Sequence, residues 1–196
     1  MRILLFSLLF LSAFTLKSYA GNPGDEYQKV NPASSSIVWT AKKVTGQHTG
    51  SVMVKEGALQ IKKGTLIGGH ITIDMTSIKN SDMSGQYAGK LEDHLKSDEF
   101  FSVTKFPVAN LIILDSKSTG NNQYHVKANV TIKGITQPVE FDTTLKPDGK
   151  NYRADATITI DRTLFDVRYG SGKFYENLGD KTIYDNFDLN VALVTE

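Results

Sequence analysis

The chain has 196 residues, and its charges nearly balance, with 22 Lys and Arg against 21 Asp and Glu. This length fits one domain or a small pair of domains, and interspersed, near-neutral charge gives no electrostatic case for nucleic-acid binding. The chain has no cysteine, which excludes a cysteine nucleophile, thiolate metal ligands and a lipidated N-terminal cysteine. An exported domain of this size can bury enough surface to fold without disulfides.

Residues 1–20 have the features of a secretory signal peptide. Met1-Arg2 is a short basic start, residues 3–16 are almost unbroken apolar sequence, and Ser18 and Ala20 are the small residues of a cleavage site. A membrane anchor is the alternative, but the apolar run is short for a span and a cleavage site follows it. We therefore expect cleavage after Ala20, a periplasmic or secreted protein, and no transmembrane segment in the mature chain.

Residues 21–35 are rich in Gly, Pro, Ser and Asn and predict a loose N-terminal arm. From residue 36 to residue 196, apolar and polar residues alternate as they do in strands with one buried face. Short turn sequences separate these segments and predict hairpins, with turns at 46–50 and at Gly57. Gly68-Gly69 predicts a bulge or tight bend. The predicted strands are 37–41, 51–56, 58–62, 65–75, 108–115, 123–133, 139–145, 152–161 and 183–194.

The period changes at residues 91–107. Ala88, Leu91 and Leu95 are spaced three and four apart, which predicts one apolar face of a short helix. An aromatic run follows, and Pro107 ends it because proline cannot donate a ladder hydrogen bond. We expect the helix and the aromatic run to form a lid on a β structure.

Eight or nine strands and one helix predict an all-β antiparallel fold, either a sandwich or a barrel. Several inward positions carry small residues, namely Gly69, Ala128, Ala154 and Ala156. A sandwich core would fill that space with larger side chains, whereas an eight-stranded barrel can hold one ligand. The sequence therefore favours an all-β, antiparallel eight-stranded barrel with one short helix as its lid.

Two long motifs resemble signatures of the YceI-like family. Residues 94–103 (HLKSDEFFSV) with 105–107 (KFP) are similar to the family pattern HL.S.DFFDV.KYP, and residues 130–139 (VTIKGITQPV) are similar to LTIKGVTKPV. A third element, RTLF at 162–165, is similar to the family's R..F segment. With strand-like segments in the expected order between them, the resemblance covers roughly residues 36–194.

The resemblance implies a lipocalin-like barrel, exported to the periplasm, with an elongated apolar cavity for a polyisoprenoid or similar long-chain amphiphile. The ligand is expected to be a polyisoprenoid, a quinone or a fatty-acid-like lipid, with no other cofactor required. The alternation and the resemblance together predict a set of ligand-binding side chains in the barrel lumen: Trp39, Phe100, Phe101, Phe106, Val126, Ala128, Val130, Phe141, Ile158, Arg162, Phe165 and Phe187.

Polar residues suggest two further interpretations. Arg162 and Arg168 could bind a pyrophosphate or quinone head group, because guanidinium groups bind such oxygens well, or could form ion pairs with Asp161 and Asp166. The histidines show no HxH or HExxH spacing, so no metal site is predicted. His94 is expected in the helix's polar network or at the cavity mouth.

Three functions remain open at this point. The first is a non-catalytic carrier or storage protein for a hydrophobic small molecule. The second is an enzyme or redox partner that acts on a bound quinone or prenyl head group through His94 or Arg162, although no G-x-S-x-G elbow or catalytic carboxylate pair is present. The third is a structural barrel with a filled core. A homodimer is compatible with all three.

Overall fold

The structure is a computed structural model that describes residues 26–196. The predicted signal peptide and residues 21–25 lie outside the described residues. One α-helix and two short 3-10 helices accompany nine strands. In chain order the elements are β1 (Glu26–Lys29), β2 (Ser36–Lys43), β3 (Gly46–Lys62), β4 (Thr65–Asn80), α1 (Gly85–Lys96), β5 (Val108–Gly120), β6 (Gln123–Ile132), β7 (Ile135–Asp148), β8 (Asn151–Asp161), η1 (Arg162–Phe165), η2 (Gly179–Lys181) and β9 (Ile183–Val194).

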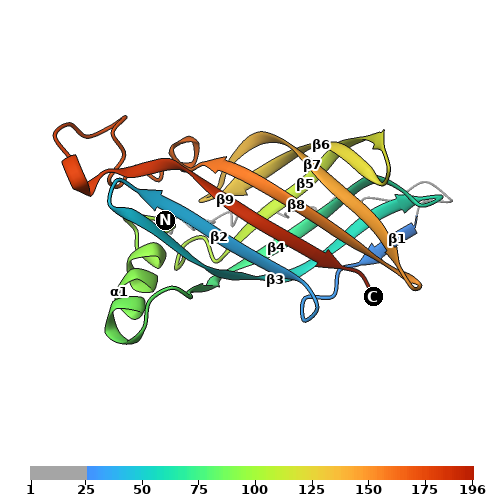
Figure 1. The fold of residues 1–196 in the computed structure, drawn as a ribbon, viewed down its shortest axis with the longest axis horizontal. Coiled ribbons are helices and arrows are strands. Elements are labelled where there is room, and N and C mark those ends of the chain that lie inside the picture. The colour runs from blue at the N-terminus through green and yellow to red at the C-terminus, as the bar shows by residue number, and fades with distance from the viewer. Residues whose placement is uncertain (1–25) are drawn as a thin grey trace, which may run out of the picture.

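The predicted all-β antiparallel barrel is confirmed. Strands β2 to β9 form one sheet of eight strands in the order β3-β2-β9-β8-β7-β6-β5-β4. The sheet closes into a barrel because its two edge strands, β3 and β4, also pair with each other. The strands run obliquely along an elongated body, with α1 at one end (Figure 1). Apolar side chains on alternate positions face the interior and form the core. Among the described residues, no helix is both long enough and apolar enough to cross a membrane.

Part of the predicted N-terminal arm belongs to the sheet. Glu26–Lys29 forms β1, which pairs with residues 58–61 of β3 beyond the end of β2. Val30 then bridges Thr195 and is buried. The composition of residues 21–35 predicted a loose segment, but the ladder hydrogen bonds and the burial of Val30 hold its second half against the barrel.

The predicted turns at 46–50 and at Gly57 are wrong, because β3 runs without interruption from Gly46 to Lys62. Gly50 and Gly57 serve close packing instead of chain reversal. A Cβ on Gly50 would overlap the Trp39 ring and the Lys79 carbonyl oxygen. The predicted bulge in β4 is confirmed: its register against β3 shifts near Gly68, and Gly69 has a φ of +153°, in the region that favours glycine.

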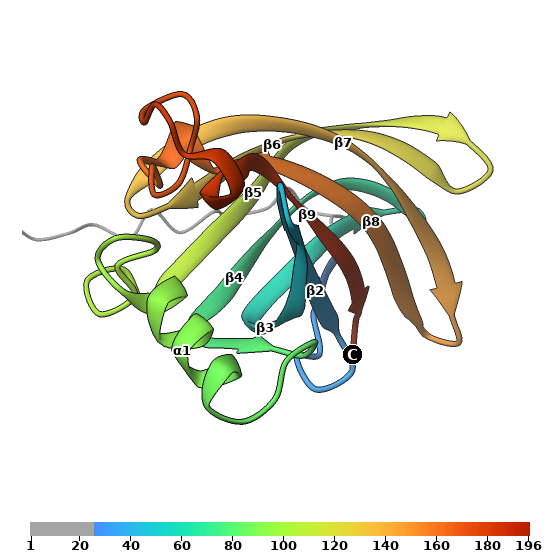
Figure 2. The same ribbon diagram turned by 60° about the vertical axis from the view of Figure 1, so that its left-hand side comes forward.

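The barrel end beside α1 is covered by the helix and by residues 97–107, which we call the lid segment (Figure 2). Three backbone hydrogen bonds tie this segment to the last turn of α1: Ser97 N to His94 O (3.1 Å), Phe101 N to Leu95 O (3.1 Å) and Val103 N to Lys96 O (2.9 Å). They turn the aromatic run back toward the barrel. The change of apolar spacing at residues 91–107 thus marks the point where the strands give way to α1 and the lid segment.

Candidate ligand cavity

The barrel encloses an apolar cavity. The centre of a water-sized sphere has about 160 Å³ in which to move, which corresponds to room for roughly ten water molecules. Among its lining residues, only Asn110, Thr143, Arg162 and Tyr184 carry polar groups other than the indole of Trp39. An almost unbroken hydrocarbon wall gives a polar ligand nothing to bind, so the cavity suits an apolar chain.

The lid segment contributes directly to this wall. Leu95 from α1 and Phe100 and Phe101 from the lid segment line the cavity. The rings of Phe100 and Phe101 meet edge to face with centroids 5.2 Å apart, and Phe101 meets Phe187 of β9 at 6.3 Å. Such aromatic pairs are favourable beyond their buried area, so a cluster of aromatic contacts holds the lid segment against β9.

Eight of the twelve side chains predicted from the sequence lie at the cavity surface. They come from β2, the lid segment and β6 to β9, which the closed barrel brings together. These residues are Trp39, Phe100, Phe101, Val130, Phe141, Ile158, Arg162 and Phe187. Their contact with a ligand stays a prediction.

The other four predicted residues do not reach the cavity surface. Val126 and Ala128 are buried on the same face of β6 as Val130, but they do not line the cavity. Phe106 lies outside the lumen and packs over Gly134 at the β6–β7 turn. Phe165 is buried in η1. Inward or aromatic character in the sequence does not distinguish a cavity wall from tightly packed core.

Much of the cavity wall comes from β3 and β4, whose lining residues the sequence did not indicate. Strict alternation back from Ile71 and Ile73 would put Ile67 on the inward face, whereas the bulge near Gly68 moves Ile67 off that face and puts Leu66 on it. The missed lining residues on these two strands are Val52, Leu59, Leu66, Ile71, Ile73, Met75 and Ile78.

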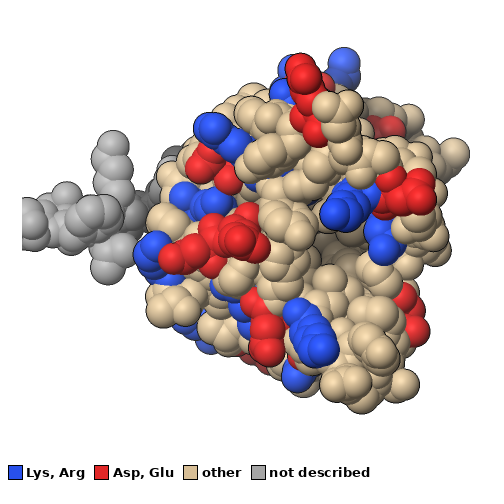
Figure 3. Space-filling model, turned by 90° about the vertical axis from the view of Figure 1, so that its left-hand side faces the viewer, with Lys and Arg blue, Asp and Glu red and all other residues tan. Residues whose placement is uncertain are grey.

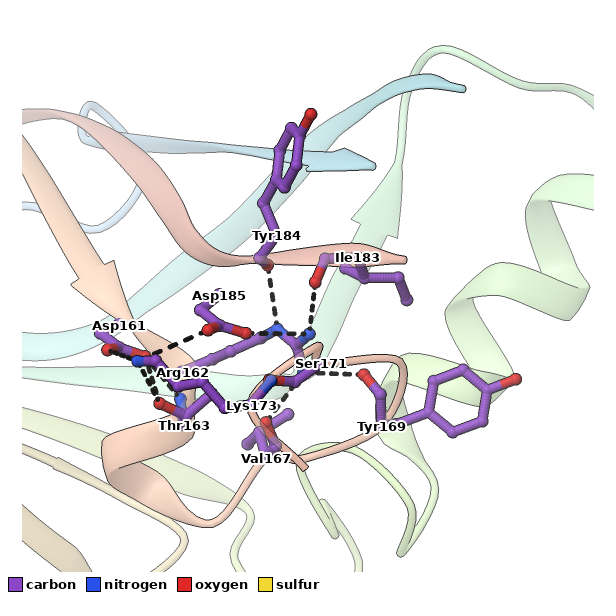
Figure 4. Close-up of polar contacts among 10 residues, drawn as sticks. All are labelled: Asp161, Arg162, Thr163, Val167, Tyr169, Ser171, Lys173, Ile183, Tyr184 and Asp185. Atoms are coloured by element: carbon purple, nitrogen blue, oxygen red, sulfur yellow. Dashed lines mark hydrogen bonds and ion pairs between the residues drawn. The ribbon is translucent and has the colours of Figure 1, made fainter. Parts of the chain in front are cut away.

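Within residues 26–196, Arg162 is the one charged residue of the wall, and its side chain is only 3% exposed. Its guanidinium donates four hydrogen bonds to backbone carbonyl oxygens (Figure 4). Nε donates to Tyr184 (3.1 Å), Nη1 to Val167 (2.8 Å) and Tyr169 (2.8 Å), and Nη2 to Ile183 (2.9 Å). Burial lowers the pKa of this guanidinium, against the opposing effect of Asp185 and Asp161. Because these four hydrogen bonds use most of its N–H donors, the Arg162 guanidinium holds the 166–184 loop in place and is not free to bind a head group.

We call Arg162 and its four carbonyl acceptors the arginine clamp, and further charged side chains lie beside it. Lys173 Nζ contacts Asp161 Oδ2 at 2.8 Å and Asp185 Oδ2 at 3.4 Å, and Asp185 Oδ1 lies 3.7 Å from Arg162 Nη2. Burial raises the pKa of Asp161, but hydrogen bonds from Lys173 and Thr163 outweigh it, and the pKa lies below the ordinary value. The four charged groups therefore stabilise one another, which fits a structural role.

Of the two interpretations of the arginines, the geometry favours ion pairing and carbonyl binding over a head-group site. Arg168 is exposed, pairs with Asp166 at 2.6 Å and lies over the Phe174 ring. His94 stacks edge-on against Phe100 and Tyr169 and approaches Glu99 at 3.5 Å, but it does not line the cavity. Within residues 26–196, no three His, Asp or Glu side chains are placed to hold a metal ion.

Tyr184 marks an opening of the cavity. It lines the cavity, yet it is 51% exposed, and its side chain points away from the arginine clamp (Figure 4). The space-filling view onto the α1 end shows a hollow with charged side chains of both signs around its rim (Figure 3). The wall of the cavity is thus accessible from this end.

On the outer face, His125 of β6 lies between two carboxylates of β7, with Asp142 at 2.8 Å and Glu140 at 3.1 Å. Hydrogen bonds to Asp142 and Glu140 raise the pKa of the imidazole above 6.5. Because the folded-state value is the higher one, the stabilisation is complete below pH 6.5 and is lost as the pH rises through the folded-state pKa. In an NMR titration, we expect Asp142→Asn to lower the pKa of His125, and Asp148→Asn, on the same strand, to leave it unchanged; equal shifts in both variants would contradict the pairing.

Comparison with known proteins decides the family. A family model described as a YceI-like domain matches residues 28–195. The chain belongs to the YceI-like family.

Curated relatives of this YceI-like chain include a UPF0312 protein of Pseudomonas putida strain F1, 31% identical over 104 residues, which are 50% of this chain and 52% of the relative. A UPF0312 protein of Pectobacterium carotovorum is 33% identical over 89 residues, 43% of each chain. The matched stretch therefore spans about half the length of these curated relatives.

Solved structures of low sequence identity share the fold. Burkholderia cenocepacia BcnA superposes with a TM-score of 0.67 at 21% identity, covering 85% of this chain and 99% of that one. A polyisoprenoid binding domain from Saccharophagus degradans, implicated in plant cell wall breakdown, gives 0.65 at 11% identity over 87% and 99% of the two chains. These likenesses establish that the YceI-like chain has the barrel fold of these proteins.

Proposed function

We propose that this YceI-like protein binds one long apolar chain, an isoprenoid or a similar amphipathic lipid, as a non-catalytic periplasmic carrier or storage protein. The observation that carries the proposal is the cavity itself, a lumen walled by hydrocarbon side chains within a closed barrel. The name of the Saccharophagus neighbour, a polyisoprenoid binding domain, supports the same class of ligand.

The size of the cavity favours a single slender chain. Roughly ten water molecules at ~30 Å³ each correspond to ~300 Å³, the lower end of the range for ligand pockets. Burial of ~10 methylene groups at ~0.8 kcal/mol each supplies roughly 8 kcal/mol, from which ordering of the chain and loss of tumbling subtract. A two-chain lipid would not fit without widening the barrel, and a short fatty acid would bind weakly.

The polar residues support a carrier over an enzyme. Arg162 reaches the wall, but four backbone carbonyls occupy its donors. His94 packs between Phe100 and Tyr169 away from the lumen. The two groups that the sequence offered for chemistry on a head group are therefore held in structural contacts. The open lumen also argues against a purely structural barrel with a filled core.

The periplasmic part of the proposal rests on residues 1–20, whose pattern is that of a signal peptide. If the chain is exported and cleaved after Ala20, the mature protein begins at Gly21. N-terminal sequencing of the protein from a periplasmic extract tests this directly. Recovery of the uncleaved chain from the cytoplasm would contradict it.

The ligand-binding part is tested by native purification, solvent extraction and mass spectrometry. We expect a long-chain lipid in close to one-to-one ratio with the protein, which is released only when the protein is denatured. The delipidated protein should then take up a prenyl alcohol. A protein that carries no lipid and takes up none after delipidation would refute the proposal.

A further inference from the structure

The hydrogen-bond ladder of the barrel is interrupted between β7 and β8. These strands pair only from Thr143 opposite Ala156 to Asp148 opposite Asn151. Residues 135–142 of β7 are paired with β6 alone, and residues 157–161 of β8 with β9 alone. The two strands leave their hairpin together and then diverge (Figure 2). We call the unpaired stretch the β7–β8 seam.

The far end of the seam is held by side-chain contacts instead of a ladder. Gln137 Nε2 donates to the Leu164 carbonyl oxygen (3.3 Å), and Lys133 Nζ donates to that of Asp166 (2.9 Å). Both acceptors lie in or just after η1, which follows β8 directly. The seam is thus bounded at one end by the hairpin ladder and at the other by η1.

The inner and outer rims of the seam differ in chemistry. Phe141 of β7 and Ile158 and Ile160 of β8 line the cavity on the inside. On the outside lies a second hollow, the outer cleft, which Asp142 and Thr157 help to line. Three residues, Thr143, Ala156 and Val191, line both the cavity and the outer cleft. In the described part of the chain, only these three residues therefore separate the apolar lumen from the polar cleft at the point where the β7–β8 ladder stops.

The outer cleft is built from hydroxyl, amide and carboxylate groups. None of its lining residues within the described chain is Lys or Arg. Its two acids are already paired, Asp142 with His125 at 2.8 Å and Asp155 with Arg153 at 2.8 Å. The residues that line it are Ser36, Val38, Thr119, Gln123, Asp142, Thr143, Thr144, Asp155, Ala156, Thr157, Asn190, Val191 and Ala192.

We propose that the outer cleft is the subsite for the polar head of the bound amphiphile, which emerges through the β7–β8 seam, and that it takes a neutral hydroxyl- or amide-bearing head. The described lining offers an anionic head no cation of its own, and the two cations nearest to its acids, His125 and Arg153, are already paired with Asp142 and Asp155. Hydroxyl and amide groups can exchange hydrogen bonds with the Thr, Ser, Asn and Gln side chains. This proposal rests on the proposed function, since it requires a chain in the lumen.

The test compares two probes with the same chain, geranylgeraniol and geranylgeranyl monophosphate, by calorimetric titration at low ionic strength. The wild type is expected to bind the alcohol about tenfold more tightly. Thr157→Lys places a cation in the cleft and should shift the phosphate-to-alcohol affinity ratio toward phosphate by about fivefold, the effect of one contact between opposite charges in water.

Thr159→Lys is the matched control. Thr159 lies two residues further along the exposed face of β8 and bonds Asp188 of β9 as Thr157 bonds Asn190, but it does not line the cleft. The phosphate-to-alcohol affinity ratio of Thr159→Lys should stay at the wild-type value. Equal shifts in both variants, no shift in either, or a shift produced only by Tyr184→Lys at the α1 end would overturn the head-group subsite.

The two proposals fail differently. A wild-type protein that binds both probes equally and ignores Thr157→Lys retains the proposed function and loses only the subsite. A wild-type protein that binds neither probe loses both.

Discussion

Replacing Ala156 with phenylalanine is expected to weaken binding of a long-chain lipid at least 100-fold while the free protein stays folded. Ala156 is half-buried, lines the lumen and lies between Thr143 and Val191 in the sheet. A phenyl ring would occupy about six methylene equivalents of the space, or roughly 5 kcal/mol of ligand burial at ~0.8 kcal/mol each. A 100-fold loss needs only about 2.8 kcal/mol.

The stability of the Ala156→Phe variant should change little, because the ring enters existing space instead of displacing packed atoms. We expect a change of no more than about 1 kcal/mol in the free energy of unfolding, measured by urea denaturation. Thr159→Phe, on the exposed face of the same strand, is the control and should bind as the wild type does. A lipid affinity that survives in Ala156→Phe would place the ligand outside the lumen.

Replacing Arg162 with alanine is expected to lower the free energy of unfolding by about 3–5 kcal/mol. The change leaves the carbonyls of Val167, Tyr169, Ile183 and Tyr184 without their Arg162 donors. It also removes the buried one of Asp185's two charge partners and leaves only Lys173. Each unsatisfied buried acceptor costs about 1–3 kcal/mol before relaxation, and removal of one partner from a buried charge pair typically costs 3–5 kcal/mol. Since domains are stable by only ~5–15 kcal/mol, this is a large fraction of the total.

Arg162→Lys should recover little of this loss, because one ammonium cannot reproduce four donors in a planar fork. Arg168→Ala is the matched control: Arg168 lies in the same loop, but it is exposed and paired only with Asp166. It should change stability by less than about 1 kcal/mol, as exposed ion pairs do. If Arg162→Ala unfolds no more easily than Arg168→Ala, the arginine clamp does not hold the loop.

The barrel could be predicted because its signals are local and repeated. A period of two marks each strand, and the change of period at residues 91–107 marks the helix and lid segment. The small residues Ala154 and Ala156 also indicated free space, and both line the cavity. Each of these inferences needs only the alternation of side chains across a strand and the sizes of the residues involved.

The detailed wall could not be predicted because it depends on register. Each bulge in β3 and β4 reverses which side chains face inward. Nothing in the residue pattern indicated that Leu66, and not Ile67, would face the lumen. Likewise, Phe165 and Phe106 were predicted to line the lumen because they are aromatic and follow predicted barrel elements. In the structure, Phe165 is buried in η1 and Phe106 packs over the β6–β7 turn. For Arg162, the sequence suggested Asp161 as the partner, whereas the fold supplies four backbone carbonyls, two of them on β9.

The most direct test of the cavity is a fluorescence titration with retinol, a neutral isoprenoid alcohol, using the chain's single tryptophan. Trp39 lines the cavity and is largely buried, with its indole NH donated to the Ser51 carbonyl oxygen at 3.3 Å. A chain in the lumen should quench Trp39 by energy transfer, saturate at one retinol per protein, and fail to do so in Ala156→Phe. Tryptophan emission that stays constant, or falls without saturation and equally in Ala156→Phe, would contradict a lipid-binding lumen.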